Sequence, residues 1–188
     1  MKKLVRCKSC GYVMAEESLG DTCPACGVSR EMFEPYTDPV GESRRRILDM
    51  HLHPIAVHFP TSFAAAIVVL LIAGLFVHGT AGDYLTHTVK LMALALPVLV
   101  LAAFLAGLVD GTIRFRRIGR SQILRSKALY GALFFVFAAG LAVLVWTKGT
   151  GGAAPRLVSI VLDGGAVACS AVLGILGMRI RDAAFPGK

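Results

Sequence analysis

Charged residues are scarce in this chain of 188 residues: they make up 17%, where a soluble domain has about a quarter. With 55% hydrophobic residues and a mean hydropathy of +0.67, this shortage indicates a membrane protein. Catalytic patterns are also missing, because the sequence contains no nucleophile with an adjacent base, no paired carboxylates and no phosphate-binding loop. These absences argue against a stand-alone enzyme built on any of those devices.

The first 50 residues lack a long apolar run, and they hold four of the five cysteines. Because no hydrophobic signal segment occurs there, we expect this part to stay in the cytoplasm, where disulfides are rare. A fold of fewer than about 40 residues usually needs a disulfide, a metal or a partner. The cysteines are therefore predicted to be metal ligands rather than bridges.

Four long apolar segments follow, at about 55–78, 88–109, 128–147 and 157–178. Each has the roughly 20 residues that a membrane-spanning helix needs, and none alternates like a barrel strand. The short connections favour an up-down bundle. The predicted organisation is a small metal-binding head, 1–36, a basic linker, 37–50, and a four-helix transmembrane domain, 51–182.

The net charge of +8 comes from basic clusters that flank the apolar segments. Three clusters precede the first segment, separate the second from the third, and follow the fourth; their members are Arg44, Arg45 and Arg46, then Arg114, Arg116, Arg117, Arg120, Arg125 and Lys127, then Arg179, Arg181 and Lys188. Four spans place all three clusters on one side, which the positive-inside rule makes the cytoplasm. We therefore expect a multi-pass inner-membrane protein with both termini cytoplasmic, and no nucleic-acid partner.

The cysteines form two pairs, Cys7-x-x-Cys10 and Cys23-x-x-Cys26, separated by twelve residues. Each pair suits a tight knuckle with two thiolates on one side, and two knuckles complete a tetrahedron of sulfurs typical of zinc or iron. A glycine follows each pair, where a loop often needs a positive φ. The spacing predicts a single four-cysteine metal site.

The residues around these pairs resemble the rubredoxin-like domain found at an end of rubrerythrins, over about residues 3–36. The matching elements are Cys7-Lys-Ser-Cys10-Gly-Tyr12, Asp21-Thr-Cys23-Pro-Ala-Cys26-Gly27 and Phe33. The resemblance implies a small β-rich domain that binds one iron through the four cysteines and transfers one electron. Zinc ribbons share the spacing, so zinc remains the alternative ion.

The first apolar segment opens with the sequence His51-Leu-His53-Pro-Ile-Ala-Val-His58-Phe-Pro60. With the apolar run after it, this box resembles the start of the four-helix family called domain of unknown function 2231, over about residues 50–180. Pro54 suits a first helical turn, so we expect His53 at the helix cap and His58 about one turn inside. Five residues place these histidines about 140° apart, so they do not share one helix face.

Intramembrane polar residues are costly and suggest function. We consider His53, His58 and Asp110 a candidate quinone site near the cytoplasmic side, together with Lys127. The simpler alternative is that the histidines cap the helix and hydrogen-bond to Asp110 or to the backbone. Other residues considered are His78 and His87 as haem ligands, Asp163 in the outer part of the fourth helix, and Cys169 as a core-packing residue.

These interpretations combine into a membrane-anchored, rubredoxin-like iron protein that carries single electrons rather than a stand-alone enzyme. Its expected partners are the lipid bilayer, a soluble redox protein and, through the histidine box, a quinone. Alternatives are a zinc-ribbon binding or regulatory module on a membrane scaffold, or a subunit of a quinone- or haem-linked oxidoreductase. Transport has less support, and the oligomeric state stays open.

Overall fold

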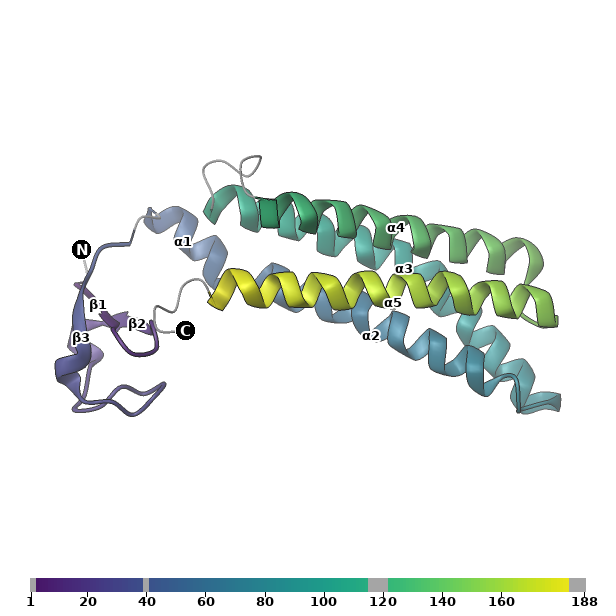
Figure 1. Ribbon diagram of the computed structural model, residues 1–188, viewed down its shortest axis with the longest axis horizontal. Helices are drawn as coiled ribbons and strands as arrows, with labels where there is room; N and C mark the ends of the chain where they lie inside the picture. Colours follow the sequence, from purple (N-terminus) through teal and green to yellow (C-terminus); the bar gives the residue numbers. More distant parts are fainter. Residues whose placement is uncertain (1–2, 39–40, 115–121, 183–188) are drawn as a thin grey trace. The chain divides into compact units, whose positions relative to one another are not determined.

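The computed structural model describes residues 3–38, 41–114 and 122–182 (Figure 1). The chain divides into two compact units: Arg46–Leu176 forms one, and the residues before and after it form the other. The basic residues predicted between the second and third helices lie partly in 115–121, outside the described residues, as does Lys188.

The head contains a three-stranded antiparallel sheet, as the β-rich prediction requires. Its strands are β1 (Leu4–Cys7), β2 (Val13–Ala15) and β3 (Phe33–Tyr36), in the order β2-β1-β3. Two short 3-10 helices, η1 (Glu16–Ser18) and η2 (Arg30–Met32), connect the sheet to the loops. The central strand therefore pairs on both sides and leads directly into the first cysteine.

One charged pair crosses the sheet between its central strand and β3. Arg6 lies opposite Glu34 in the β1–β3 register, and its Nε donates to the carboxylate at 3.0 Å. The guanidinium also lies 5.6 Å from the centre of the Tyr36 ring. These contacts join β1 to β3 at a half-exposed surface of the head, where they add modestly to its stability.

Part of the predicted linker 37–50 is helical, since residues Glu42–Asp49 form helix α1. Its sequence, ESRRRILD, is polar and contains no long apolar run. Glutamate, arginine and leucine are nevertheless good helix formers, and Leu48 is buried. Helix formation here needs no long apolar run.

Four long helices follow, each long and apolar enough to span a membrane: α2 (Leu52–Ala73), α3 (Gly79–Arg114), α4 (Gln122–Lys148) and α5 (Ala153–Asp182). The ends of these helices differ from the predicted ends of the apolar segments. Helix α2 stops five residues before the predicted 78, and α3 begins nine residues before the predicted 88. Hydropathy reports which residues suit lipid and does not determine where helical hydrogen bonding ends. Helix α3 therefore includes a polar turn before its apolar segment, whereas α2 ends while the sequence is still apolar.

The bundle core is continuous across the four helices. Its most buried large side chains include Ile67 and Leu71 on α2, Leu96 on α3 and Leu141 on α4. Small residues let the helices approach closely: a Cβ at Gly165 on α5 would lie 2.8 Å from the Phe137 ring on α4. Gly165 therefore serves close packing between α4 and α5.

Candidate metal centre

The first knuckle, Cys7–Tyr12, is closed by two backbone hydrogen bonds. The Cys7 N–H donates to the Tyr12 carbonyl at 2.8 Å, and the Gly11 N–H donates back to the Cys7 carbonyl at 2.8 Å. Gly11 has φ 73°, which a residue with a Cβ rarely adopts. The strand pairing of β1 and β2 encloses this turn, so the sheet fixes the position of both of its thiols.

The second knuckle, Cys23–Val28, repeats the first one in detail. The Cys23 N–H donates to the Val28 carbonyl at 2.7 Å, and the Gly27 N–H donates to the Cys23 carbonyl at 2.9 Å. Gly27 has φ 77°. A single antiparallel bridge between Thr22 and Ser29 encloses this turn, as strand pairing encloses the first. The prediction that each glycine takes a positive φ is thereby confirmed.

The two knuckles bring all four sulfur atoms within 4.8 Å of one another. Across the site, the Sγ atoms of Cys7 and Cys26 are 3.8 Å apart, and those of Cys10 and Cys23 are 3.7 Å apart. Metal–sulfur bonds of about 2.3 Å place the sulfurs of a regular tetrahedron about 3.8 Å apart. A disulfide would need about 2.05 Å, so the cysteines are free thiols arranged to fit a tetrahedral metal ion.

The four ligands differ in their exposure to solvent. The first cysteine of each knuckle is buried, Cys7 at 1% and Cys23 at 2% exposed, whereas Cys10 is half-buried and Cys26 is exposed. The site therefore has an inner pair of sulfurs held under the sheet and an outer pair near the surface. Among the described residues, this is the one cluster of three or more side chains that could share a metal ion.

Crowding of the thiols separates their pKa values. The Tyr12 backbone N–H acts to lower the pKa of Cys10, but desolvation and the hydrogen bonds of the other three thiols raise it to about 12. Desolvation acts to raise the pKa of Cys23, but the N–H groups of Ala25 and Cys26, with the Cys26 and Cys10 thiols, lower it to about 7. Four neighbouring thiolates need a central cation, which a metal ion supplies.

Residues 6–34 match the family model of the rubrerythrin rubredoxin-like domain. The head is a rubredoxin-like, four-cysteine domain. No curated protein and no solved structure matches the chain. The rubredoxin-like match covers the two knuckles and the sheet that carries them, and it does not extend into the helices. The resemblance of residues 50–180 to the domain of unknown function 2231 family stays a prediction.

His53 of the histidine box and Asp110 of α3 line the same cavity, which has a volume of about 90 Å³. The rest of its lining is apolar: Ile47, Leu52, Ala106 and Val109. The His53 Nδ1 lies 3.2 Å from the Ala103 carbonyl of α3, and its ring packs against Gly107, where a Cβ would lie 2.8 Å away. His53 is not the helix cap that we predicted, because α2 begins at Leu52 with His51 as its cap, at φ 52°.

The other candidate residues are not part of the lining of this cavity. His58 is exposed, and its Nδ1 lies 2.6 Å from the Pro54 carbonyl of its own helix, as the capping alternative requires. His78 and His87 are exposed near the start of α3. Lys127 of α4 lies near enough to Asp110 for their charges to attract. Cys169 is buried in the bundle core, where we expected it.

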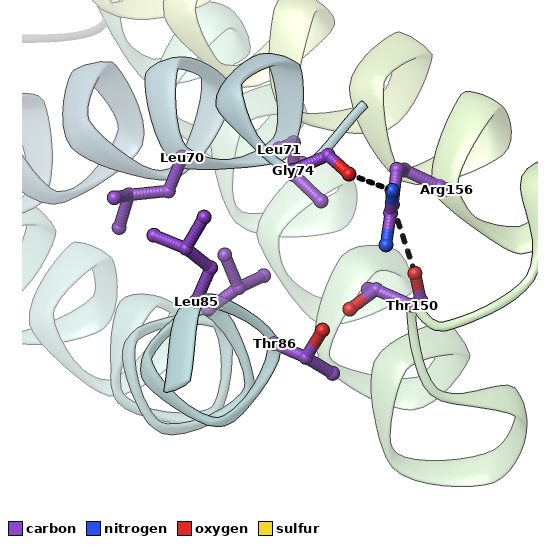
Figure 2. Close-up of a pocket in the computed structure, with 8 residues that line it drawn as sticks. Leu70, Leu71, Gly74, Leu85, Thr86, Thr150 and Arg156 are labelled. Atoms are coloured by element: carbon purple, nitrogen blue, oxygen red, sulfur yellow. Dashed lines mark hydrogen bonds between the residues drawn. The ribbon is translucent and has the colours of Figure 1, made fainter. Parts of the chain in front are cut away.

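Sequence reasoning missed the structural role of Arg156. Its Nε donates to the Thr150 carbonyl at 3.0 Å, and its guanidinium also donates to the Gly74 carbonyl at the end of α2 (Figure 2). It thereby joins α5 to both the loop before it and another helix. The available signal was a lone arginine directly before the fourth apolar segment.

Proposed function

We propose that this protein is a membrane-anchored electron carrier whose head binds one iron ion through Cys7, Cys10, Cys23 and Cys26. The tetrahedral arrangement of the four sulfurs carries the proposal. Iron held by four thiolates supplies a one-electron couple. The rubredoxin-like match of residues 6–34 favours iron over zinc, which takes the same ligand set.

The protein's own residues then determine how an electron enters and leaves. Cys7 and Cys23 are shielded by the sheet, so the ion is reached from the side of Cys10 and Cys26. The exposed Cys26 sulfur is the shortest path between the ion and a docked protein. We expect a soluble redox protein to dock on this edge of the head, and N–H groups near the sulfurs to tune the potential.

The test is a visible spectrum of the purified full chain, oxidised and then reduced, with metal analysis. We expect one iron per chain and a thiolate-to-iron colour that bleaches on reduction. Cys26→Ser should remove the colour, whereas Cys169→Ser, a buried cysteine outside the site, should keep it. A colourless protein with one zinc would contradict the proposal and favour a structural zinc module.

We further propose that the helices lie in the inner membrane with both termini in the cytoplasm. The basic clusters at the ends of the spans support this orientation. A reporter fused after Lys188 should give a cytoplasmic signal. A signal from the opposite side would contradict the four-span arrangement.

A quinone-linked role is a second candidate, and the cavity beside His53 favours it. His53 and Asp110 both line this cavity. An imidazole and a carboxyl group can hydrogen-bond to a quinone carbonyl or a quinol hydroxyl. The proposed role is electron exchange between the quinone pool and the electron carrier.

Gly107→Ala tests this role, because the added methyl group would lie 2.8 Å from the His53 ring and must displace it. We expect a water-soluble quinone analogue to bind the wild-type chain and to bind this variant at least about tenfold more weakly, a loss of 1.4 kcal/mol. Gly140→Ala is the matched control, since its Cβ would meet only the Leu162 side chain at 3.8 Å. Equal binding to both variants would contradict the quinone site.

A further inference from the structure

Asp163, on helix α5, is a fully buried carboxyl group in the bundle, with 0% exposure. Its side chain faces the main chain of Val68 on α2, yet neither carboxyl oxygen has a hydrogen-bond partner. The Val68 N–H lies inside α2, where it belongs to the helical hydrogen bonding. Asp163 thus places a carboxyl group in the bundle interior with no hydrogen bond to offset the loss of its hydration.

No charged side chain compensates Asp163 from the helices packed around it. The apolar stretches 59–77, 91–109 and 128–147 contain no aspartate, glutamate, lysine or arginine. Beyond these stretches, Lys90 lies over the Trp146 ring, Lys127 lies near Asp110, and Arg156 donates to two main-chain carbonyls. An unpaired carboxylate in such surroundings is strongly disfavoured, whereas the neutral acid is tolerated.

We propose that Asp163 is a proton-binding site inside the membrane bundle, loaded from the end at which α5 begins. The ligand is a proton rather than a metal ion, because hard cations require several oxygen ligands and the carboxyl is surrounded mainly by apolar side chains. The site is independent of the rubredoxin-like head and goes beyond the electron-carrier function.

A polar stripe on α5 leads from that end to Asp163. Arg156, Ser159 and Asp163 are three and four residues apart in sequence, so they follow one face of the helix. Ser159 is fully buried, and its hydroxyl donates to the Pro155 carbonyl at 2.8 Å. The hydroxyl oxygen therefore retains acceptor capacity one turn from the carboxyl.

The Arg156 end of this stripe borders a small cavity lined by leucines and a few polar residues (Figure 2). The cavity is about 10 Å³, about the size of one water molecule, and its lining includes Thr86, Thr150 and Arg156. A hydronium ion at this end gives its proton to the Ser159 oxygen and leaves as water, while the Ser159 hydrogen passes to the carboxylate. The result is one neutral acid and an unchanged serine. The reverse transfer releases the proton at the same end.

The infrared spectrum of the full chain in lipid bilayers at pH 7 tests the protonation state. We expect the carbonyl-stretch band of a protonated carboxylic acid, absent in Asp163→Asn and retained in Asp83→Asn, at an exposed aspartate near the start of α3. Labelling the wild-type chain with ¹³C-aspartate should shift the band, which assigns it to aspartate even if a variant fails to fold. Absence of the band in the wild-type chain would overturn the proposal.

Transfer of the same sample to D₂O tests the route by which the proton reaches Asp163. We expect the acid band to shift as the proton exchanges, and Ser159→Ala to slow that exchange by about a hundredfold, as for loss of a positioned proton-transfer group. Ser170→Ala, on the same helix beyond Asp163, is the control and should exchange like the wild type. Lack of exchange in the wild type, or an unchanged rate in Ser159→Ala, would overturn loading through this end.

Discussion

In the head, the buried side chains are Val5, Cys7, Leu19 and Cys23, two of which are metal ligands, whereas the bundle has a core drawn from all four of its helices. The head places its ligands with backbone hydrogen bonds and two glycines at positive φ. The bundle is held by interlocking apolar side chains. The head is thus organised around a metal site, whereas the bundle is organised by side-chain packing.

Removing the metal should produce the largest difference between the two units. A structural metal in a small cysteine domain contributes about 10–16 kcal/mol of folding free energy. We therefore expect Cys7→Ser to unfold the head while the bundle keeps its helices. Limited proteolysis within residues 3–38 reports the head, and circular dichroism reports the helices. Retention of one metal ion per chain in both Cys7→Ser and Cys26→Ser would exclude a four-thiolate site.

A cavity in the bundle core should have the converse effect. Leu141 is fully buried, so Leu141→Ala is expected to lower the free energy of unfolding of the bundle by about 2–5 kcal/mol while the head keeps its metal. Thermal unfolding in detergent, followed with metal analysis, measures both. Leu91→Ala, at a leucine that is 70% exposed, is the control and should change stability by less than about 0.5 kcal/mol. Loss of metal in Leu141→Ala would show that the two units are not independent.

A backbone change in a knuckle should have a smaller effect. Gly27 has φ 77°, and a Cβ there would meet no atom within 4 Å, so Gly27→Ala isolates the conformational penalty. That penalty is about 1–2 kcal/mol, which should weaken metal binding about tenfold in competition with a chelator. Gly20→Ala is the control in the same head, because Gly20 has no positive φ and also has open space. Equal binding by both variants would contradict the role of the glycine.

The surface pair of the head should have the smallest effect. Arg6 and Glu34 are 40% and 35% exposed at their side chains, and such pairs contribute about 0–1 kcal/mol. We expect Arg6→Gln to shift the chelator midpoint only slightly, and high salt to remove the shift by screening the charges. A large shift that persists in high salt would indicate that the head depends on this pair as much as on its ligands.

The metal site could be predicted from the sequence because its determinants are local. Two residues between paired cysteines and a glycine after each pair are enough to specify a knuckle. The helix ends were less predictable, since Gly79 begins α3 within a polar stretch that hydropathy does not mark. The bonds of Arg156 and the contact between His53 and Gly107 join different helices. Such contacts depend on how helices pack, which one sequence does not specify.

The repeated knuckle also bears on the kinetics of metal exchange. The second knuckle begins at Cys23, sixteen positions after Cys7, and each knuckle contributes two of the four sulfurs. When one knuckle releases the ion, the other still holds it, and the tethered thiols return at a local concentration in the millimolar range. The ion therefore leaves only when the second knuckle opens before the first has closed again. We therefore expect exchange between iron and zinc to be slow once the head is loaded, so that the ion available during loading strongly influences which one the head holds.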